Sequence, residues 1–483
     1  MDLKHLPDSL HYVGVGGIGM SGLAQMCVEL GCSVSGSDRA IHDPASQRIF
    51  EALRSGGVAL YPQDGSVYQQ RTPGAIVYST AIEEDNPDFV QAPDLPVLHR
   101  SQALALSVNA LQNKHTIAVT GTCGKTTVSA WLAEALENLG ADPGFLGGGL
   151  VNAFVSENRA GNFKGGKGKY FVLEADESDK SLLNYQTDSA LVMNIGTDHY
   201  DKEELARIFR AFVLSGRNGV FVIEDQAFLQ MDPQALAGKN IVLFSQDFNA
   251  GGKCCGRTVR KLDSYTVRQG KVFCSFDGMR EICIPFPGIH NAVNALAVYS
   301  LLQELGYSAP AVLDAVENFH GVWRRFDFAG KIADNTVPVY DDYAHNVEKI
   351  LSCLAGARSV TSGRILALFQ PHGFAPLRFM RQELFHALEQ FLNPDDRFAM
   401  LPVYYAGGTA SFTPTSEEVI QEYNSTSAGK SNCYSYLQNR EDGRQWLYRN
   451  AAEGDVVLIM GARDNSLSSW AKEIVQKQKG AES

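Results

Sequence analysis

Long apolar runs are absent from this sequence of 483 residues. No segment approaches the run of about 18 apolar residues that a membrane-spanning helix needs. The N-terminal segment MDLKHLPDSLHYVGVGG also lacks an apolar stretch followed by a small-residue cleavage site, so it does not resemble a signal peptide. Both absences predict a soluble, cytoplasmic protein without a membrane partner.

Closely spaced cysteines of the CxxC type are absent too. The nine cysteines are scattered along the chain, and an odd number suits free thiols in a reducing compartment. The neighbours Cys254 and Cys255 could form a redox pair, but adjacent cysteines close only strained disulfides. We therefore predict free thiols.

An excess of basic residues is the third absence. The chain has 42 Lys and Arg against 54 Asp and Glu, which gives a net charge of -12. This balance argues against broad binding to nucleic acid or to an anionic membrane, although a local basic pocket for phosphates remains possible. A hydrophobic content of 45% is typical of a soluble globular protein.

Apolar, β-branched segments alternate with segments of helical period along the whole chain. The alternation predicts an α/β fold with mostly parallel sheets, and the length predicts about three domains of roughly 150 residues each. A polar turn near 107–114 and a basic linker near 322–330 place the domains at 1–108, 109–323 and 324–483. The glycine-rich stretch 161–169 is expected to be a mobile loop.

The segment AVTGTCGKTT at 118–127 is the strongest functional signal. A predicted strand ends at a glycine turn and a helix begins at Lys125, so backbone N–H groups and the helix N-terminus would face a phosphate. Lys125 would then reach the β- and γ-phosphates of ATP, and the Thr126 hydroxyl would bind Mg²⁺. The spacing is shorter than that of the usual phosphate loop. The alternative interpretation is a plain glycine turn at a helix start.

Two further strand ends carry candidate metal ligands. The segment LEADESD at 173–179 has four acids after the strand that follows the phosphate loop, and NIGTDH at 194–199 ends the next strand. Carboxyl ends of parallel strands converge on ligands. An acid from the first segment and the imidazole of His199 could therefore share a divalent ion that also touches ATP. Taken alone, such an acid is usually solvated, and a lone histidine usually lies on the surface.

The N-terminal glycines form a third candidate site. Gly14, Gly16 and Gly19 follow a predicted strand in the pattern G-x-G-x-x-G, and Asp38 ends the next strand. Alone, this arrangement indicates an NAD enzyme. The pattern indicates that a diphosphate binds at a helix N-terminus, but it does not indicate nicotinamide. The second nucleotide site, for ATP, favours a function other than that of an NAD enzyme.

Together these segments resemble the Mur ligase family. The motifs VGVGGIGMSGLAQ, TGTCGKTT, EADESD, NIGTDHYD, GIHNAVN, RRFDFAG and DDYAHN occur in the family's order and cover essentially the whole chain. The resemblance implies a Rossmann-like UDP-binding domain, a central ATPase domain and a Rossmann-like C-terminal domain. It implies ATP and Mg²⁺ as cofactors. The implied activity joins the carboxylate of UDP-N-acetylmuramate to the amine of a free amino acid, L-alanine above all, through an acyl phosphate in peptidoglycan precursor synthesis.

The resemblance also assigns roles to residues. Phosphoryl transfer would depend on Lys125, Glu174, His199 and Arg325, and the metal would be held by Thr126, Glu174 and His199. The UDP-sugar would contact Gly16, Gly17, Ile18, Gly19, Ser79 and Thr80, and the amino acid would face His345 and His372. The expected ATP contacts are Gly121, Thr122, Cys123, Gly124, Lys125, Thr126, Thr127, Asn291, Asn294, Arg325 and one of the hinge aspartates Asp341 and Asp342, between which the resemblance does not choose.

Departures from the family pattern leave alternatives open. Gly373 follows His372 where an arginine is expected near the amino-acid carboxylate, and the late loop reads Gly461-Ala-Arg-Asp464. A sibling ligase that attaches a recycled peptide or another amino acid to the same UDP-sugar is therefore the first alternative. An NAD-dependent oxidoreductase and a catalytically silent binding scaffold are more remote. A monomer or weak homodimer without a nucleic-acid partner is expected.

Overall fold

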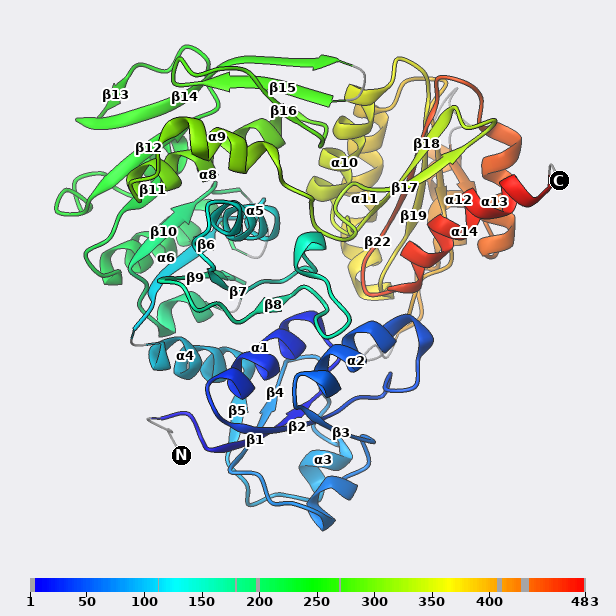
Figure 1. Ribbon diagram of the computed structural model, residues 1–483. Helices are drawn as coiled ribbons and strands as arrows, with labels where there is room; N and C mark the ends of the chain where they lie inside the picture. The colour runs from blue at the N-terminus through cyan, green and yellow to red at the C-terminus, as the bar shows by residue number, and fades with distance from the viewer. Residues whose placement is uncertain are drawn as a thin grey trace. The chain divides into compact units, whose positions relative to one another are not determined.

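The computed structural model describes residues 5–111, 113–178, 180–196, 200–268, 271–405, 411–426 and 434–481. The chain forms two compact units that divide between Trp323 and Arg324, except that the short segments 266–272 and 285–289 group with the second unit. Both units are built from mostly parallel sheets and helices (Figure 1), so the predicted α/β class is confirmed.

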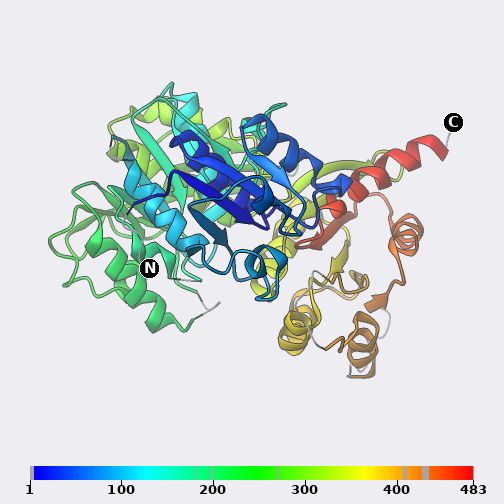
Figure 2. The same ribbon diagram turned by 90° about the horizontal axis from the view of Figure 1, so that it is seen from below.

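The first sheet occupies the N-terminal part of the first unit. All its strands are parallel, in the order β3-β2-β1-β4-β5, and Figure 2 shows them side by side in blue. The order reverses between β1 and β4, and ligands of parallel sheets bind at such a switch point. The elements are β1 (Ser9–Val13), α1 (Ile18–Glu29), β2 (Ser33–Ser37), η1 (Pro44–Ser46), α2 (Gln47–Ser55), β3 (Ala59–Tyr61), η2 (Ser66–Gln69), β4 (Ala75–Tyr78), α3 (Pro87–Val90), β5 (Val97–His99) and α4 (Arg100–Ala110).

The second sheet of this unit has the order β16-β15-β14-β12-β11-β10-β6-β9-β7-β8, with β13 paired to β14. Strand β6 lies between β9 and β10 and runs parallel to both, so the carboxyl ends of these three strands are neighbours. The strands are β6 (His115–Thr120), β7 (Gly144–Leu146), β8 (Phe163–Lys164), β9 (Tyr170–Glu174), β10 (Ser189–Val192), β11 (Phe221–Glu224), β12 (Ile241–Ser245), β13 (Lys253–Cys254), β14 (Arg257–Arg268), β15 (Lys271–Phe276) and β16 (Ile282–Ile284). The helices are α5 (Lys125–Asn138), η3 (Asn152–Phe154), η4 (Ser181–Asn184), α6 (Lys202–Ser215), α7 (Asp225–Gln230), α8 (Ile289–Glu304) and α9 (Ala309–Glu317).

The second unit has a six-stranded sheet in the order β17-β18-β22-β19-β20-β21, antiparallel only between β17 and β18. Both faces of the central strand β19 (Ile365–Gln370) are buried. Ile365 and Phe369 pack in one apolar cluster, and Leu366 and Leu368 pack in another. This double burial explains why the strand is a continuous apolar run. The elements are β17 (Asp327–Ile332), β18 (Val337–Asp342), α10 (Val347–Val360), β19 (Ile365–Gln370), α11 (Phe374–Phe391), β20 (Arg397–Met400), α12 (Ser416–Thr426), β21 (Tyr434–Tyr436), α13 (Arg440–Asn450), β22 (Val456–Gly461) and α14 (Ser466–Ala481).

The glycine-rich stretch 161–169 is not simply a loop, so this prediction is wrong for its first part. It contains β8, which pairs antiparallel with β7. The Lys164 ammonium is buried and donates to Asp142 Oδ1 at 2.6 Å, and Lys114 Nζ donates to the carbonyls of Gly166 and Gly168, both at 2.6 Å. The glycine carbonyls are thus acceptors for a lysine far away in sequence, a contact that composition does not reveal.

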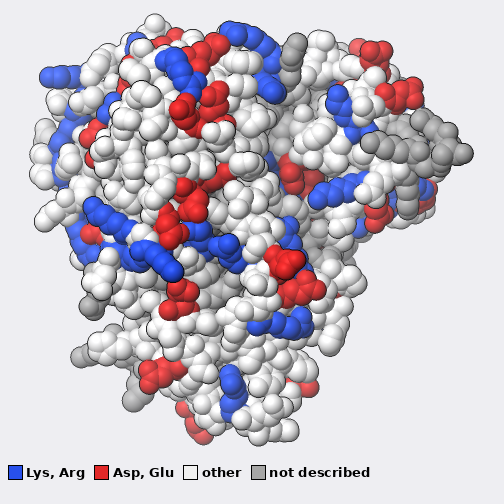
Figure 3. All heavy atoms as spheres, in the orientation of Figure 1, with Lys and Arg blue, Asp and Glu red and all other residues white. Residues whose placement is uncertain are grey.

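Surface charge agrees with the composition. On the face drawn in Figure 3, the described Lys, Arg, Asp and Glu side chains are interspersed rather than separated by sign. This differs from the one-sided basic surface that marks nucleic-acid-binding proteins. Within the described residues, no helix combines the length and apolar character needed to cross a membrane.

Candidate functional site

The predicted phosphate loop, 121–124, follows β6 and opens α5, as expected. Gly121 has φ 136° and Gly124, the N-cap of α5, has φ 88°, a region that favours glycine. A Cβ atom on Gly121 would lie 2.9 Å from Met193 Cβ and 3.0 Å from the Asn194 amide nitrogen. The loop therefore needs glycine both for its backbone angles and for its close approach to the end of β10.

The end of β10 holds this loop in shape. Asn194 accepts from the Cys123 amide through Oδ1 at 2.8 Å and donates through Nδ2 to the Cys123 carbonyl at 3.0 Å. The buried Thr122 hydroxyl accepts from the Gly196 amide at 2.8 Å. Cys123 and Thr127 are half-buried on the same turn. Sequence reasoning missed Asn194, although it stands at the strand end already considered for metal binding.

The Lys125 side chain folds back over the loop. Its Nζ donates to the Gly121 carbonyl at 2.8 Å and to Glu177 Oε1 at 2.9 Å, and the Glu177 side chain is only 2% exposed. Burial opposes the charged form of Lys125, but the neighbouring carboxylates, Glu177 foremost, raise the pKa of Lys125. Burial raises the pKa of Glu177, against the effect of Lys125. Since the two groups stabilise each other's charged forms, we describe them as an ion pair.

Thr126 and Glu174, two of the predicted metal ligands, are in contact. The Thr126 hydroxyl donates to Glu174 Oε1 at 3.0 Å, and the Gly148 amide donates to Glu174 Oε2 at 2.8 Å. A hydroxyl and a carboxylate are oxygen donors of the kind that Mg²⁺ prefers. Among the described residues, no group of three His, Cys, Asp or Glu side chains could hold a metal ion. The third predicted ligand, His199, lies outside the described residues.

The predicted adenine-side residues stand next to the phosphate loop. Asn291 and Asn294 lie one turn apart in α8, both buried, and Asn294 Nδ2 donates to Asn291 Oδ1 at 3.3 Å. A Cβ atom on Gly124 would lie 3.2 Å from Asn294 Oδ1. The structure therefore brings α8 against the loop, and the adenine role of the two asparagines stays a prediction.

The N-terminal glycine turn is built differently. Gly14 has φ 75°, Gly17 caps α1, and Ile18 begins it. The Gly16 amide donates to Asp38 Oδ2 at 2.8 Å, while Asp38 Oδ1 accepts from the Ala40 amide at 2.8 Å. One carboxylate oxygen of Asp38 thus accepts from the glycine turn, and the other accepts from the loop that contains Asp38. An NAD enzyme would use this acid on the ribose, so the arrangement weakens that alternative.

Arg100 lies over this turn, and sequence reasoning missed it. Arg100 is the first residue of α4, and a Cβ atom on Gly19 would lie 3.0 Å from Arg100 Nη1. Burial works against ionisation of Asp176, but Lys125 foremost, then hydrogen bonds from Ser178 and last the charge of Arg100 lower the pKa of Asp176. One guanidinium therefore lies over the glycine turn and is close enough to influence an acid beside the phosphate loop.

The segment expected near uridine, which includes Ser79 and Thr80, follows β4 on the other side of the switch point. The Ile82 amide donates to the Ser79 carbonyl at 3.1 Å, which closes a turn, and Ile82 Cδ1 would lie 2.8 Å from a Cβ atom on Gly14. The two predicted UDP-binding segments are therefore adjacent.

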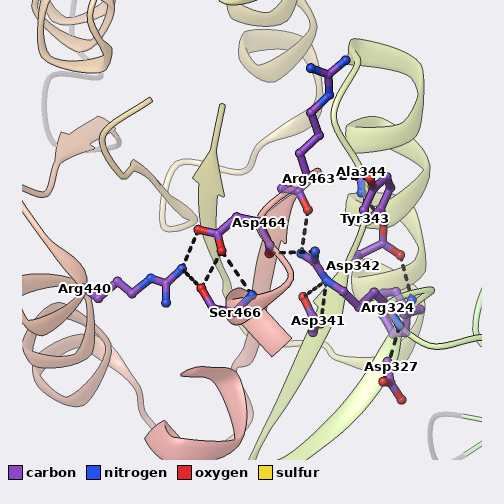
Figure 4. A network of polar contacts seen from close by, with 12 residues as sticks. Arg324, Asp327, Asp341, Asp342, Tyr343, Ala344, Arg440, Arg463, Asp464 and Ser466 are labelled. Carbon is purple, nitrogen blue, oxygen red and sulfur yellow. Dashed lines mark hydrogen bonds and ion pairs between the residues drawn. The ribbon is translucent and has the colours of Figure 1, made fainter. Parts of the chain in front are cut away.

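In the second unit, Arg324 anchors the start of the C-terminal chain (Figure 4). Its guanidinium is fully buried and donates from Nε to Asp341 Oδ2 at 3.0 Å, and from its two terminal nitrogens to the carbonyls of Asp464 (3.0 Å) and Gly461 (2.6 Å). Asp342 accepts from the amides of Phe326 and Ala344, both at 2.7 Å. Both hinge aspartates thus hold the protein's own chain together.

Arg325 and the two predicted amino-acid-side histidines also lie in this unit. Arg325 is half-buried, with its guanidinium carbon 5.7 Å from the Tyr343 ring centroid. The rings of His345 and His372 meet edge to face with centroids 5.0 Å apart. Burial, helped by Lys349, lowers the pKa of His345 to about 3, and burial, helped by Arg463, lowers the pKa of His372 to about 4. Both imidazoles are therefore neutral near pH 7 among cationic side chains.

Family models and similar proteins match most of the chain. Family models match residues 9–111 (Mur ligase family, catalytic domain), 119–302 (Mur ligase middle domain) and 324–463 (Mur ligase, glutamate ligase domain). The UDP-N-acetylmuramate–L-alanine ligase of Renibacterium salmoninarum is 34% identical over 94% of this chain and 93% of its own. Two solved structures share the fold at 24% identity. They are the UDP-N-acetylmuramate–alanine ligase of Thermotoga maritima, with TM-score 0.77 over 98% and 99% of the two chains, and a murein peptide ligase of Psychrobacter arcticus, with TM-score 0.64 over 98% of each.

Proposed function

This chain belongs to the Mur ligase family, and on that premise we propose that it joins the carboxylate of UDP-N-acetylmuramate to the amine of L-alanine. ATP is converted to ADP and phosphate in the reaction. The observation that carries the proposal is the phosphate loop with Lys125 and Thr126 already placed against acids. The choice of L-alanine as the amino acid is based on the names of the similar ligases. The product is a peptidoglycan precursor made in the cytoplasm.

The chemistry follows from the weak electrophilicity of a carboxylate. A carboxylate oxygen first bonds to the γ-phosphorus of ATP while the bond to ADP breaks, which yields an acyl phosphate. The amine nitrogen then attacks the acyl carbon, loses a proton to solvent, and expels phosphate that carries the former carboxylate oxygen. Both steps depend on in-line positioning and on neutralising charge at the phosphoryl group.

The first unit supplies most of that neutralisation. The amides of 121–124 and the start of α5 face the phosphates, and Lys125 exchanges its partner Glu177 for phosphate oxygens when ATP binds. The family resemblance implies that Arg325 would add a further positive charge at the γ-phosphate. The Thr126 hydroxyl and the Glu174 carboxylate, together with His199, would hold Mg²⁺, which supplies further positive charge when bound. Glu174 is already oriented by the Gly148 amide.

The UDP-sugar would bind at the N-terminal turn. The diphosphate would lie at the start of α1 near Gly16–Gly19, with uridine toward Ser79 and Thr80. Arg100 lies over Gly19 and influences Asp176 beside the phosphate loop. Arg100 would therefore donate hydrogen bonds to the diphosphate at this turn.

The amino acid would bind in the second unit. His345 and His372 are neutral, and the charges of Lys349 and Arg463 act on them. A carboxylate would be stabilised among such cations, with neutral imidazoles as hydrogen-bond partners. Arg463 therefore offers the positive charge that Gly373 cannot provide after His372.

The test is phosphate release by the purified protein with ATP, Mg²⁺ and UDP-N-acetylmuramate, with each of the twenty amino acids in turn. We expect release above background with L-alanine, and only background release when either the amino acid or the UDP-sugar is omitted. Release that ignores the UDP-sugar would contradict the proposal. NADH oxidation in the same preparation would revive the oxidoreductase alternative.

A sibling ligase that adds a peptide is the second candidate. Gly373 in place of the expected arginine favours it, because a longer acceptor could place its carboxylate elsewhere. The same assay with the tripeptide L-alanyl-γ-D-glutamyl-meso-diaminopimelate separates the two candidates. A kcat/KM at least tenfold higher for the tripeptide than for L-alanine would move the assignment to the sibling.

A further inference from the structure

The C-terminal cap of α1 brings two cysteine side chains together. Gly31 has φ 93°, the Gly31 amide donates to the Val28 carbonyl at 2.9 Å, and the Cys32 amide donates to the Cys27 carbonyl at 2.9 Å. These are the two hydrogen bonds of a Schellman motif, in which the side chains at the positions of Cys27 and Cys32 usually make an apolar contact. In this protein the contact is between two thiols.

Polar groups converge on the inner thiol. Cys27 is fully buried, with Sγ 3.0 Å from the Tyr12 hydroxyl and 3.4 Å from the Ser107 hydroxyl. A hydrogen bond from Cys32 foremost, with those from Ser107 and Tyr12, lowers the pKa of Cys27 against the effect of burial. Burial raises the pKa of Tyr12 well above its usual range, so the phenol keeps its proton. The Cys27 thiolate is therefore stabilised by its surroundings, whereas the hydrogen bond to Cys27, together with burial, raises the pKa of Cys32.

The outer thiol can be reached from solvent. Cys32 is half-buried and lines a cavity of about 360 Å³ together with His5, Asp8, Leu30 and Asn109. Cys27 does not line this cavity. A small molecule could therefore meet Cys32 but not Cys27, which sets an order of reaction between the two sulfurs.

We propose that Cys27 and Cys32 form a thiol–disulfide site that is oxidised by a low-molecular-weight disulfide. Cys32 Sγ loses its proton and attacks one sulfur of the small disulfide, which forms a mixed disulfide and releases one small thiol. Cys27 Sγ, as the thiolate, then attacks Cys32 Sγ and releases the second small thiol. The protein loses two protons and two electrons, and the small disulfide is reduced to two thiols.

The site lies on the helix that carries the glycine turn. Helix α1 begins at Ile18 after that turn. Asn162, in the connection between β7 and β8, donates through Nδ2 to the Ser21 hydroxyl at 2.8 Å and accepts through Oδ1 from Gln25 Nε2 at 3.4 Å. The disulfide would fix the far end of this helix. The inference concerns the thiols alone and does not depend on the proposed ligase reaction.

The experiment exposes the native full-length protein to oxidised glutathione, then denatures it and blocks the remaining thiols. Glu29 lies between the two cysteines, so a glutamate-specific protease separates them before mass spectrometry. We expect the Cys27 and Cys32 peptides to be joined, and to separate after dithiothreitol. Buried Cys353 should stay a thiol, and exposed Cys255 should take up glutathione.

Variants test the order of reaction. Cys32→Ser should leave Cys27 unmodified, and Cys27→Ser should leave glutathione on Cys32. If Cys27→Ser does not fold, the results for the wild type and for Cys32→Ser still test the proposal. Glutathione on Cys32 beside a free Cys27 in the wild type would overturn the proposal. So would two free thiols at these positions while Cys255 is modified, or a bond from Cys32 to any other cysteine.

Discussion

The two glycine turns of the first unit have the same local plan but different surroundings. Each follows a central parallel strand and opens a helix, the first after β1 and the second after β6. At the first turn the Gly16 amide is bonded to Asp38, and an arginine from another helix lies over Gly19. At the second turn, Lys125 and Thr126 of the helix itself are held by Glu177 and Glu174.

Under the proposed function, the difference separates a turn that binds the UDP-sugar from a turn that also takes part in phosphoryl transfer. Backbone amides and one guanidinium are sufficient to hold a diphosphate that does not react. Transfer of a phosphoryl group also needs charge that is fixed before the reaction begins. The acids around the second turn fix that charge, because they hold Lys125 ionised and orient Thr126.

The largest effect is expected from Lys125→Ala. The loss should lower kcat by about 100-fold or more, as for other groups that stabilise transition-state charge. Steady-state phosphate release measures the loss, and an unchanged melting temperature shows that the fold persists. Lys253→Ala, at an exposed position on β13, is the matched control and should keep wild-type activity. Activity of Lys125→Ala within tenfold of wild type would remove the distinction between the turns.

Glu174→Gln and Thr126→Ala should both raise the Mg²⁺ concentration needed for half-maximal activity, by about tenfold or more. Because the two side chains are in contact, the double variant should lose less than the sum of the single losses. Magnesium titrations of the three variants measure this, with exposed Glu203→Gln as control. Additive losses with unchanged Mg²⁺ dependence would show that the pair holds no shared ion.

Arg100→Ala should raise KM for UDP-N-acetylmuramate by about 10- to 100-fold, the range for a hydrogen bond to a charged group. KM for ATP and kcat should change far less, and Arg100→Lys should recover part of the loss. Arg39→Ala, an exposed arginine paired with Glu83 near the same turn, is the control. An unchanged KM for the UDP-sugar, or an equal rise for ATP, would contradict the role of Arg100 at the first turn.

The smallest effect concerns Cys123. Its position before Lys125 at the start of α5 favours the thiolate, so it should be alkylated faster than Cys255. ATP should slow this labelling, and UDP-N-acetylmuramate alone should not. Quantitative mass spectrometry of the labelled peptides measures both rates. Labelling that is no faster than at Cys255, or that ignores ATP, would refute the prediction.

The second turn could be predicted from the sequence because its parts are contiguous. An apolar strand, two glycines and Lys-Thr-Thr follow one another, and Glu174 stands at a neighbouring strand end. The role of Arg100 could not be predicted in this way. It begins α4, and its approach to Gly19 depends on how that helix returns across the sheet. No periodicity in the sequence reports such a contact.

Long-range partners also explain two other differences. The stretch 161–169 has the glycine content of a loop, but Lys114 binds its carbonyls and β7 pairs with its first part. In the basic linker, adjacent arginines look alike in sequence. Arg324 is buried on Asp341, whereas Arg325 remains half-buried beside Tyr343. Burial and pairing distinguish them, and both depend on the folded second unit.

The position of the transferred oxygen tests the central claim most directly. UDP-N-acetylmuramate labelled with ¹⁸O in its carboxylate is incubated with ATP, Mg²⁺, L-alanine and the protein, and the released phosphate is analysed by mass spectrometry. If ATP activates the carboxylate as an acyl phosphate, each phosphate carries one ¹⁸O atom from the sugar. Phosphate without the label, released while the amide product forms, would contradict the account.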